Sequence, residues 1–178
     1  MTLALDLAII NPELPKNDME DQTKPQEVSA FEWTNEAFQQ LPDDGHHYEI
    51  INGKLVDRGN SGALHGYVCS TLMILLGGYI RDKKLGAIFD SSTAFQMASG
   101  NKRSPDMAFF AKERLQGISL LTSGYLEGAP DLVVEVLSPG NIVAEIDSKL
   151  EEYFANGCRL VWIIHPVQRY ILGYHNAQ

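Results

Sequence analysis

Residues 130–139 read PDLVVEVLSP, and this stretch decides the fold. The apolar run between Pro130 and Pro139 predicts a strand that is buried on both faces of a sheet. Glu135 stands in the middle of that run. A carboxylate inside a buried strand is costly unless it is paired or binds a metal. The sequence therefore predicts a functional acid in a central strand.

A second lone acid, Asp106, precedes another apolar run in RSPDMAFF (residues 103–110). Neighbouring strands lie about 4.8 Å apart, so acids on one face of adjacent strands can share an ion. Carboxylate oxygens suit a hard divalent cation such as Mg²⁺. We therefore predict a metal site made by Asp106 and Glu135. Ordinary ion pairs, or a strand-start role for Asp106 after Pro105, remain alternatives.

The surrounding pattern predicts a mixed α/β domain in which helices flank a central sheet. Asn52-Gly53 lies between two alternating apolar runs and predicts a two-residue β-hairpin near the N-terminus. The strand at 131–137, a helix at 145–156 and a strand at 159–165 predict a parallel βαβ crossover. Further helices are expected at 34–41 and 64–81, further strands at 86–97, 104–110 and 169–175, a polar turn at 98–103 and a loop-rich segment at 111–129.

Length and composition limit the class of protein. The chain has 178 residues, a net charge of −9 and two cysteines, Cys69 and Cys158. We expect a polar arm at 1–29, a single domain at 30–178, and buried thiols in a reducing compartment. The opening residues lack the basic start of a secretory signal, and no apolar run approaches about 18 residues. These features predict a cytoplasmic protein with no membrane segment.

Several motifs together carry a family resemblance. They are YEI-x-NG-K-L-V at 48–56, LHG at 64–66, SPD at 104–106, APDLVVEVLSP at 129–139, and KLEEY followed by VWIIHP within 149–166. In this order they resemble the Uma-type family of bacterial proteins, which belongs to the PD-(D/E)XK superfamily of phosphodiesterases. The resemblance covers about Tyr48 to Tyr174. It implies a restriction-endonuclease-like core.

The resemblance implies a role for particular residues. The aspartate of the PD motif falls on Asp106, and the acid of the (D/E)XK element falls on Glu135. The lysine of that element is replaced by Leu137. In this family the lysine is thought to come from the following helix, which points to Lys149. The implied cofactor is Mg²⁺ or Mn²⁺.

The position of Lys149 agrees with that assignment. It follows Ile146 by three residues and precedes Tyr153 by four, so it flanks the apolar face of the predicted helix. From there its long side chain could reach the carboxylates. The alternative is a surface lysine paired with Glu145 or Glu152.

Glu49 and His65 are further catalytic candidates. The family resemblance makes Glu49 an additional acid near the metal, whereas a solvent-facing strand residue is the alternative. His65 opens the long helix and could donate to a phosphate or orient an acid. A capping or structural histidine is the alternative for this position.

These residues predict a metal-dependent endonuclease that hydrolyses DNA phosphodiester bonds. Two alternatives remain open: a catalytically inactive, protein-binding module with the same fold, and a hydrolase of small phosphorylated substrates. An open cleft with Lys102 or Arg103 at its rim would favour the nuclease. A homodimer would cover the sheet edge left open after the last strand.

Overall fold

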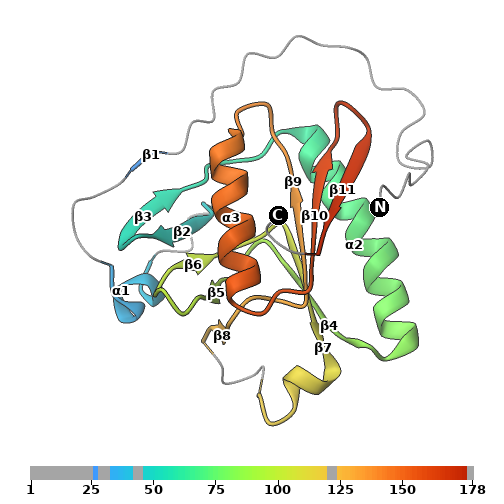
Figure 1. Ribbon diagram of the computed structural model, residues 1–178, viewed down its shortest axis with the longest axis horizontal. Helices are drawn as coiled ribbons and strands as arrows, with labels where there is room; N and C mark the ends of the chain where they lie inside the picture. The colour runs from blue at the N-terminus through green and yellow to red at the C-terminus, as the bar shows by residue number, and fades with distance from the viewer. Residues whose placement is uncertain (1–25, 28–32, 42–45, 120–123, 176–178) are drawn as a thin grey trace.

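The computed structural model describes residues 26–27, 33–41, 46–119 and 124–175. The chain forms a mixed α/β structure with two sheets, as the sequence predicts (Figure 1). The arm expected at 1–29 lies outside the described residues, except for the short strand β1 (Gln26–Glu27).

The central sheet has five strands in the order β11-β10-β9-β7-β4. β9 and β10 are parallel and are joined by α3, which confirms the predicted βαβ crossover. The other pairs are antiparallel. The bounds are β4 (Gly86–Asp90), β7 (Met107–Ala111), β9 (Leu132–Val136), α3 (Val143–Ala155), β10 (Leu160–His165) and β11 (Tyr170–Tyr174).

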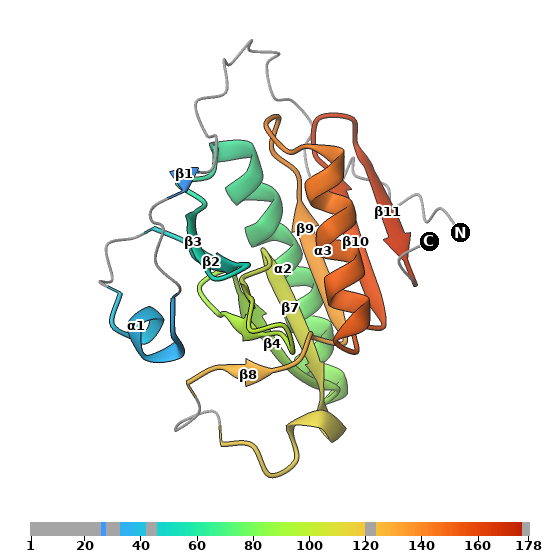
Figure 2. The ribbon, with the colours of Figure 1, turned by 60° about the vertical axis from the view of Figure 1, so that its left-hand side comes forward.

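Two helices cover opposite faces of this sheet (Figure 2). Val68 and Leu72 of α2 (Ala63–Lys83) pack against Val134 and Val136 on one face. Leu150 and Tyr153 of α3 pack against the other face. β9 is therefore buried on both sides, which is why its sequence is a continuous apolar run.

The predicted hairpin belongs to a second sheet, whose strand order is β1-β3-β2-β6-β5-β8. Its turn is made by Asn52 and Gly53, both at positive φ, as a two-residue hairpin requires. The bounds are β2 (Tyr48–Ile51), β3 (Lys54–Asp57), β5 (Phe95–Gln96), β6 (Lys102–Arg103) and β8 (Leu126–Glu127), with α1 (Asn35–Gln39) and the 3-10 helix η2 (Lys112–Leu115) nearby.

Two predicted boundaries are wrong. The strand expected at 86–97 ends at Asp90 and resumes as β5 in the other sheet. The polar turn expected at 98–103 contains β6, in which Lys102 and Arg103 are buried. β5 and β6 pair with each other as a short hairpin, and their outer neighbours, β8 and β2, come from distant parts of the chain, so no local pattern places them in the second sheet.

The outer side of α2 is an exposed apolar surface. Tyr67, Ile74, Leu75 and Tyr79 are each about half exposed or more. By length and composition alone, α2 could cross a membrane, contrary to the expectation from the sequence. One side of the helix nevertheless packs on the central sheet through Val68 and Leu72.

Candidate active site

A pocket of about 520 Å³ lies where the C-terminal end of β9 meets the N-terminal turns of α2 and α3. Both helices begin without a side-chain cap, so their first backbone N–H groups are directed towards this end of the fold. The titratable side chains that line the pocket include Glu49, Arg58, His65, Cys69, Asp106, Glu135, Glu145 and Lys149.

Asp106 and Glu135 are brought together by adjacent strands. β7 pairs with β9 so that Met107 lies opposite Val134, which places Asp106 beside Glu135. The backbone N–H of Val136 donates to Asp106 Oδ2 at 2.7 Å. Both carboxylates line the pocket, as expected for acids on one face of neighbouring strands.

Glu135 is nearly buried and has two donors. Lys149 Nζ donates to Glu135 Oε2 at 2.7 Å, and the hydroxyl of Tyr153 donates to Oε1 at 2.7 Å. Burial raises the pKa of the Glu135 carboxyl, and the nearby charge of Asp106 adds to that effect, although Lys149 opposes it. The net result is a carboxyl whose pKa is above its ordinary value.

Lys149 therefore points into the pocket rather than to solvent. Burial lowers the pKa of its ammonium, but the negative charges of Glu135 and Glu49 outweigh burial and raise it. The lysine remains charged at neutral pH. Leu137, which occupies the motif position of the lysine, packs against the core on the α3 side.

His65 approaches the other carboxylate. Its Nε2 lies 3.2 Å from Asp106 Oδ2, and its Nδ1 lies 3.5 Å from Cys69 Sγ. Burial lowers the pKa of the imidazole, but hydrogen bonding to Asp106 and Cys69 outweighs burial and raises it to about 10. In this arrangement His65 is a cation that partners Asp106.

Glu49 is buried, not solvent-facing. Its Oε2 accepts from Arg58 Nε at 2.7 Å and lies 3.5 Å from Arg103 Nη1, while its Oε1 accepts from the backbone of Ser104 at 3.1 Å. Burial raises the pKa of this carboxyl, but the charges of Lys149, Arg58 and Arg103 outweigh burial and hold it at about 2. Glu49 is therefore ionised at neutral pH.

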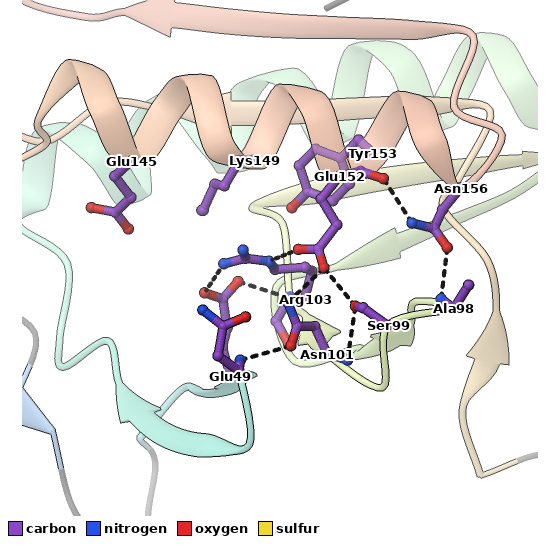
Figure 3. A network of polar contacts seen from close by, with 12 residues as sticks. Glu49, Ala98, Ser99, Asn101, Arg103, Glu145, Lys149, Glu152, Tyr153 and Asn156 are labelled. Carbon is purple, nitrogen blue, oxygen red and sulfur yellow. Dashed lines mark hydrogen bonds and ion pairs between the residues drawn. The ribbon is translucent and has the colours of Figure 1, made fainter.

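The Glu49 cluster extends to α3 through a polar network (Figure 3). Arg103 Nε donates to Glu152 Oε2 at 2.5 Å, and Asn101 and Ser99 donate to Glu152 Oε1. Arg58 also pairs with Glu145, one helical turn before Lys149. The hairpin sheet is thus tied to the helix that carries Lys149.

The structure brings all five predicted site residues to one pocket: Glu49, His65, Asp106, Glu135 and Lys149. Their catalytic and metal-binding roles stay predictions. The condition that Lys102 or Arg103 stand at the rim of the cleft is not met, because these side chains are 1% and 3% exposed and support the second sheet instead. Arg58 lines the pocket.

Sequence reasoning missed Arg58, Cys69 and Tyr153. Arg58 follows the hairpin and resembles a surface residue, and Tyr153 was assigned only to the core. Cys69 was expected to be a buried thiol but is only half buried and lines the pocket. The one available signal was spacing, since His65 and Cys69 are four residues apart on a helix and so share a face.

Chemically, the pocket combines two carboxylates from adjacent strands with an ammonium and an imidazole. Carboxylate oxygens are suitable ligands for Mg²⁺ or Mn²⁺. No described residue hydrogen-bonds to Asp106 Oδ1. Each Glu135 oxygen has one donor and so retains a lone pair. The donor set therefore fits a hard divalent ion.

Comparisons with known proteins bear on the fold and the family of this chain. A crystal structure from Anabaena variabilis ATCC 29413, described as "a putative nuclease belonging to DUF820", superposes with a TM-score of 0.70 and 19% identity. The match covers 80% of this chain and 79% of that chain, and it establishes the restriction-endonuclease-like fold. No curated protein matches the chain.

A family model named Uma2, with the description "Putative restriction endonuclease", matches residues 35–178. The matched segment contains both sheets except β1, both long helices and every residue of the pocket. This confirms the family resemblance inferred from the motifs. The chain belongs to the Uma2 family of restriction-endonuclease-like proteins.

Proposed function

We propose that this protein is a nuclease that uses Mg²⁺ or Mn²⁺ to hydrolyse DNA phosphodiester bonds. The observation that carries the proposal is the convergence of Asp106, Glu135 and Lys149 on one pocket, with the lysine 2.7 Å from Glu135. The pocket is open, which supports an enzyme over an inactive module with a blocked cleft.

Asp106 and Glu135 would hold the metal ion. When bound there, the ion would supply a water of lowered pKa and neutralise charge on the scissile phosphate. His65 and the backbone N–H of Val136 fix the orientation of the Asp106 carboxylate. Tyr153 does the same for Glu135.

Lys149 would act on the reacting atoms. Its ammonium is charged and buried, and it lies beside a carboxylate whose pKa is raised. A donor fixed in a water-poor site stabilises developing phosphate charge more effectively than the same donor in water. In this role Lys149 replaces the motif lysine that Leu137 does not provide.

The helix N-termini would bind the neighbouring phosphates. Ser61 and Gly66 at the start of α2, and Gly140 and Asn141 before α3, line the same pocket. Backbone N–H groups at a helix start favour anions. They would attract phosphate locally although the whole chain carries a charge of −9.

Glu49 would serve a different purpose in this proposal. Its carboxylate is fully engaged with Arg58, Arg103 and the backbone of Ser104. Binding a metal would require it to give up these partners. We assign it the role of holding the two arginines, and thereby α3, in place.

The direct test is a cleavage assay on single-stranded, duplex and branched DNA with Mg²⁺ or Mn²⁺. Wild type should cleave at least one substrate, and Asp106→Asn should not. Asp147→Asn, an exposed acid on α3, is the matched control and should cleave normally. Failure of wild type to cleave any substrate with either ion would reject the proposal.

A second measurement tests the metal site itself. Mn²⁺ that binds only the folded state should raise the melting temperature. At a free Mn²⁺ concentration of one hundred times Kd, it should add about 2.7 kcal/mol to the free energy of unfolding. Glu135→Gln should lose most of this rise. A variant with an unchanged Mn²⁺ shift would show that Glu135 is not a ligand.

A further inference from the structure

A second, softer set of metal ligands shares one residue with the proposed nuclease site. One ligand atom each from His65, Cys69 and Asp106 lies within 4.8 Å of the other two. All three residues line the pocket, and all are partly accessible. Glu135 and Lys149 do not belong to this group.

A helix and a strand together build the cluster. His65 and Cys69 are four residues apart on α2, so their side chains project from the same face of the helix. Asp106 stands at the start of β7 and reaches them from the sheet. The cluster therefore bridges the helix and the sheet across the pocket.

The separations suit a tetrahedral ion. Zn²⁺ bonds of about 2.0–2.3 Å place neighbouring ligand atoms about 3.3–3.6 Å apart. His65 Nε2 lies 3.2 Å from Asp106 Oδ2, and His65 Nδ1 lies 3.5 Å from Cys69 Sγ. One ion can use only one ring nitrogen. Binding therefore needs a side-chain rotation of His65 or Cys69, and it releases one proton from the imidazolium and one from the thiol.

The chemistry of the ligands separates two classes of ion. A thiolate and an imidazole favour Zn²⁺ or Cd²⁺, whereas Mg²⁺ and Mn²⁺ favour oxygen ligands. Asp106 can serve either class. We propose that His65, Cys69 and Asp106 form a binding site for a thiophilic divalent cation such as Zn²⁺, and that this ion excludes Mg²⁺ or Mn²⁺ by taking Asp106.

The binding part of this inference is independent of the proposed function, whereas inhibition of cleavage rests on it. Zn²⁺ would act as an inhibitor because its bond to Asp106 neutralises most of the carboxylate charge, so that Asp106 becomes a weak ligand for Mg²⁺ or Mn²⁺. Without Asp106, the oxygen site retains only Glu135 of its two proposed ligands. Nuclease activity would then depend on which ion occupies the pocket.

Cd²⁺ is the first probe, because a cadmium–thiolate bond gives a charge-transfer band in the ultraviolet. The metal-free, reduced full chain should show this band with one Cd²⁺ bound per chain. Cys69→Ser should lose the band, and Cys158→Ala should keep it, since Cys158 is buried elsewhere and bonds to backbone carbonyls. If Cys69→Ser does not fold by circular dichroism, Cys69→Ala takes its place.

Zn²⁺ affinity is the second measurement, made by calorimetry. Loss of even an outer-shell partner costs about 10- to 100-fold in metal affinity, so Cys69→Ser should lose at least about 100-fold. Excess Mn²⁺ should weaken Zn²⁺ binding to wild type, because both ions need Asp106. The inference would be overturned if wild type showed no Cd²⁺ band or if the band persisted in the Cys69 variant. It would also be overturned if excess Mn²⁺ left the Zn²⁺ affinity of wild type unchanged.

Cleavage supplies the last measurement. Zn²⁺ added to the Mn²⁺ enzyme should reduce the rate of wild type, relative to its own rate without Zn²⁺, about tenfold more than that of Cys69→Ser. Equal inhibition of the two proteins would overturn the shared-ligand inference. An inactive wild type would reject the proposed function, while the Cd²⁺ and Zn²⁺ binding results would still decide this site.

Discussion

Glu49 and Glu135 are both buried glutamates that line one pocket, yet their surroundings shift their pKa values in opposite directions. Glu49 is 1% exposed and its pKa falls to about 2, whereas Glu135 is 8% exposed and its pKa rises. Burial raises the pKa of both carboxyls. The difference lies in the charges around them.

Three cations lower the pKa of Glu49: Lys149, Arg58, whose guanidinium donates to it, and Arg103. Glu135 has one cation, Lys149, and it also faces the negative charge of Asp106. A carboxylate surrounded mainly by cations keeps its charge without a metal and can serve a structural role. A carboxylate that lies beside another anion would be stabilised by a metal ion. Burial alone does not distinguish a structural acid from a functional one.

The largest expected effect concerns rate. Glu135→Gln should reduce metal-dependent cleavage by about 1000-fold or more, because it removes a charge that the site needs in order to hold the metal. Glu49→Gln should lose about tenfold or less at a temperature where it remains folded. Single-turnover cleavage with Mn²⁺ measures both. Equal losses would remove the distinction between the two acids.

The free energy of unfolding should show the reverse order, with a larger loss for Glu49→Gln than for Glu135→Gln. Glu49→Gln leaves Arg58 and Arg103 without their shared anion and should cost about 3 kcal/mol in the free energy of unfolding. Glu135→Gln leaves Lys149 without its anion, but it also removes a carboxylate whose pKa is raised and whose charge the fold therefore disfavours, so it should cost only about 1 kcal/mol. Urea unfolding at neutral pH with a chelator measures both, and Glu151→Gln, exposed on α3, is the matched control.

Acid should act on Glu49 in particular. Its pKa is lowered from 4.5 to about 2, so the unfolded state binds its proton first as the pH falls. The stability from Glu49 is therefore present above pH 4.5 and is lost between 4.5 and about 2, a change of about 3 kcal/mol. Urea unfolding across this range should show a shallower loss for Glu49→Gln. An identical slope would contradict the assignment.

The last prediction concerns the Glu135 side of the comparison. Tyr153→Phe removes the hydroxyl that donates to Glu135 Oε1 and should cost about 1–2 kcal/mol in the free energy of unfolding. The loss should shrink when Mn²⁺ is bound, because the metal would then satisfy the carboxylate. Tyr170→Phe, at a partly exposed ring on β11, should leave stability nearly unchanged.

Local patterns in the sequence were sufficient for the core of the fold. The apolar run around Glu135, the crossover through α3 and the Asn52-Gly53 turn were all predicted, because each depends on residues close together in the chain. The motif acids Asp106 and Glu135 were identified for the same reason. A lone acid entering an apolar strand is visible without any partner.

Only the tertiary structure decided which polar groups meet. Arg58 and Arg103 reach Glu49 from a loop and a two-residue strand, and Glu152 joins Arg103 from α3. The segment 86–97 divides between two sheets for a similar reason. Periodicity in a sequence indicates whether a side chain faces the core, but it does not indicate which charged side chains from distant parts of the chain lie next to it. The pKa of a buried acid depends on that charge, so the sequence located the two glutamates and the fold gave them different chemistry.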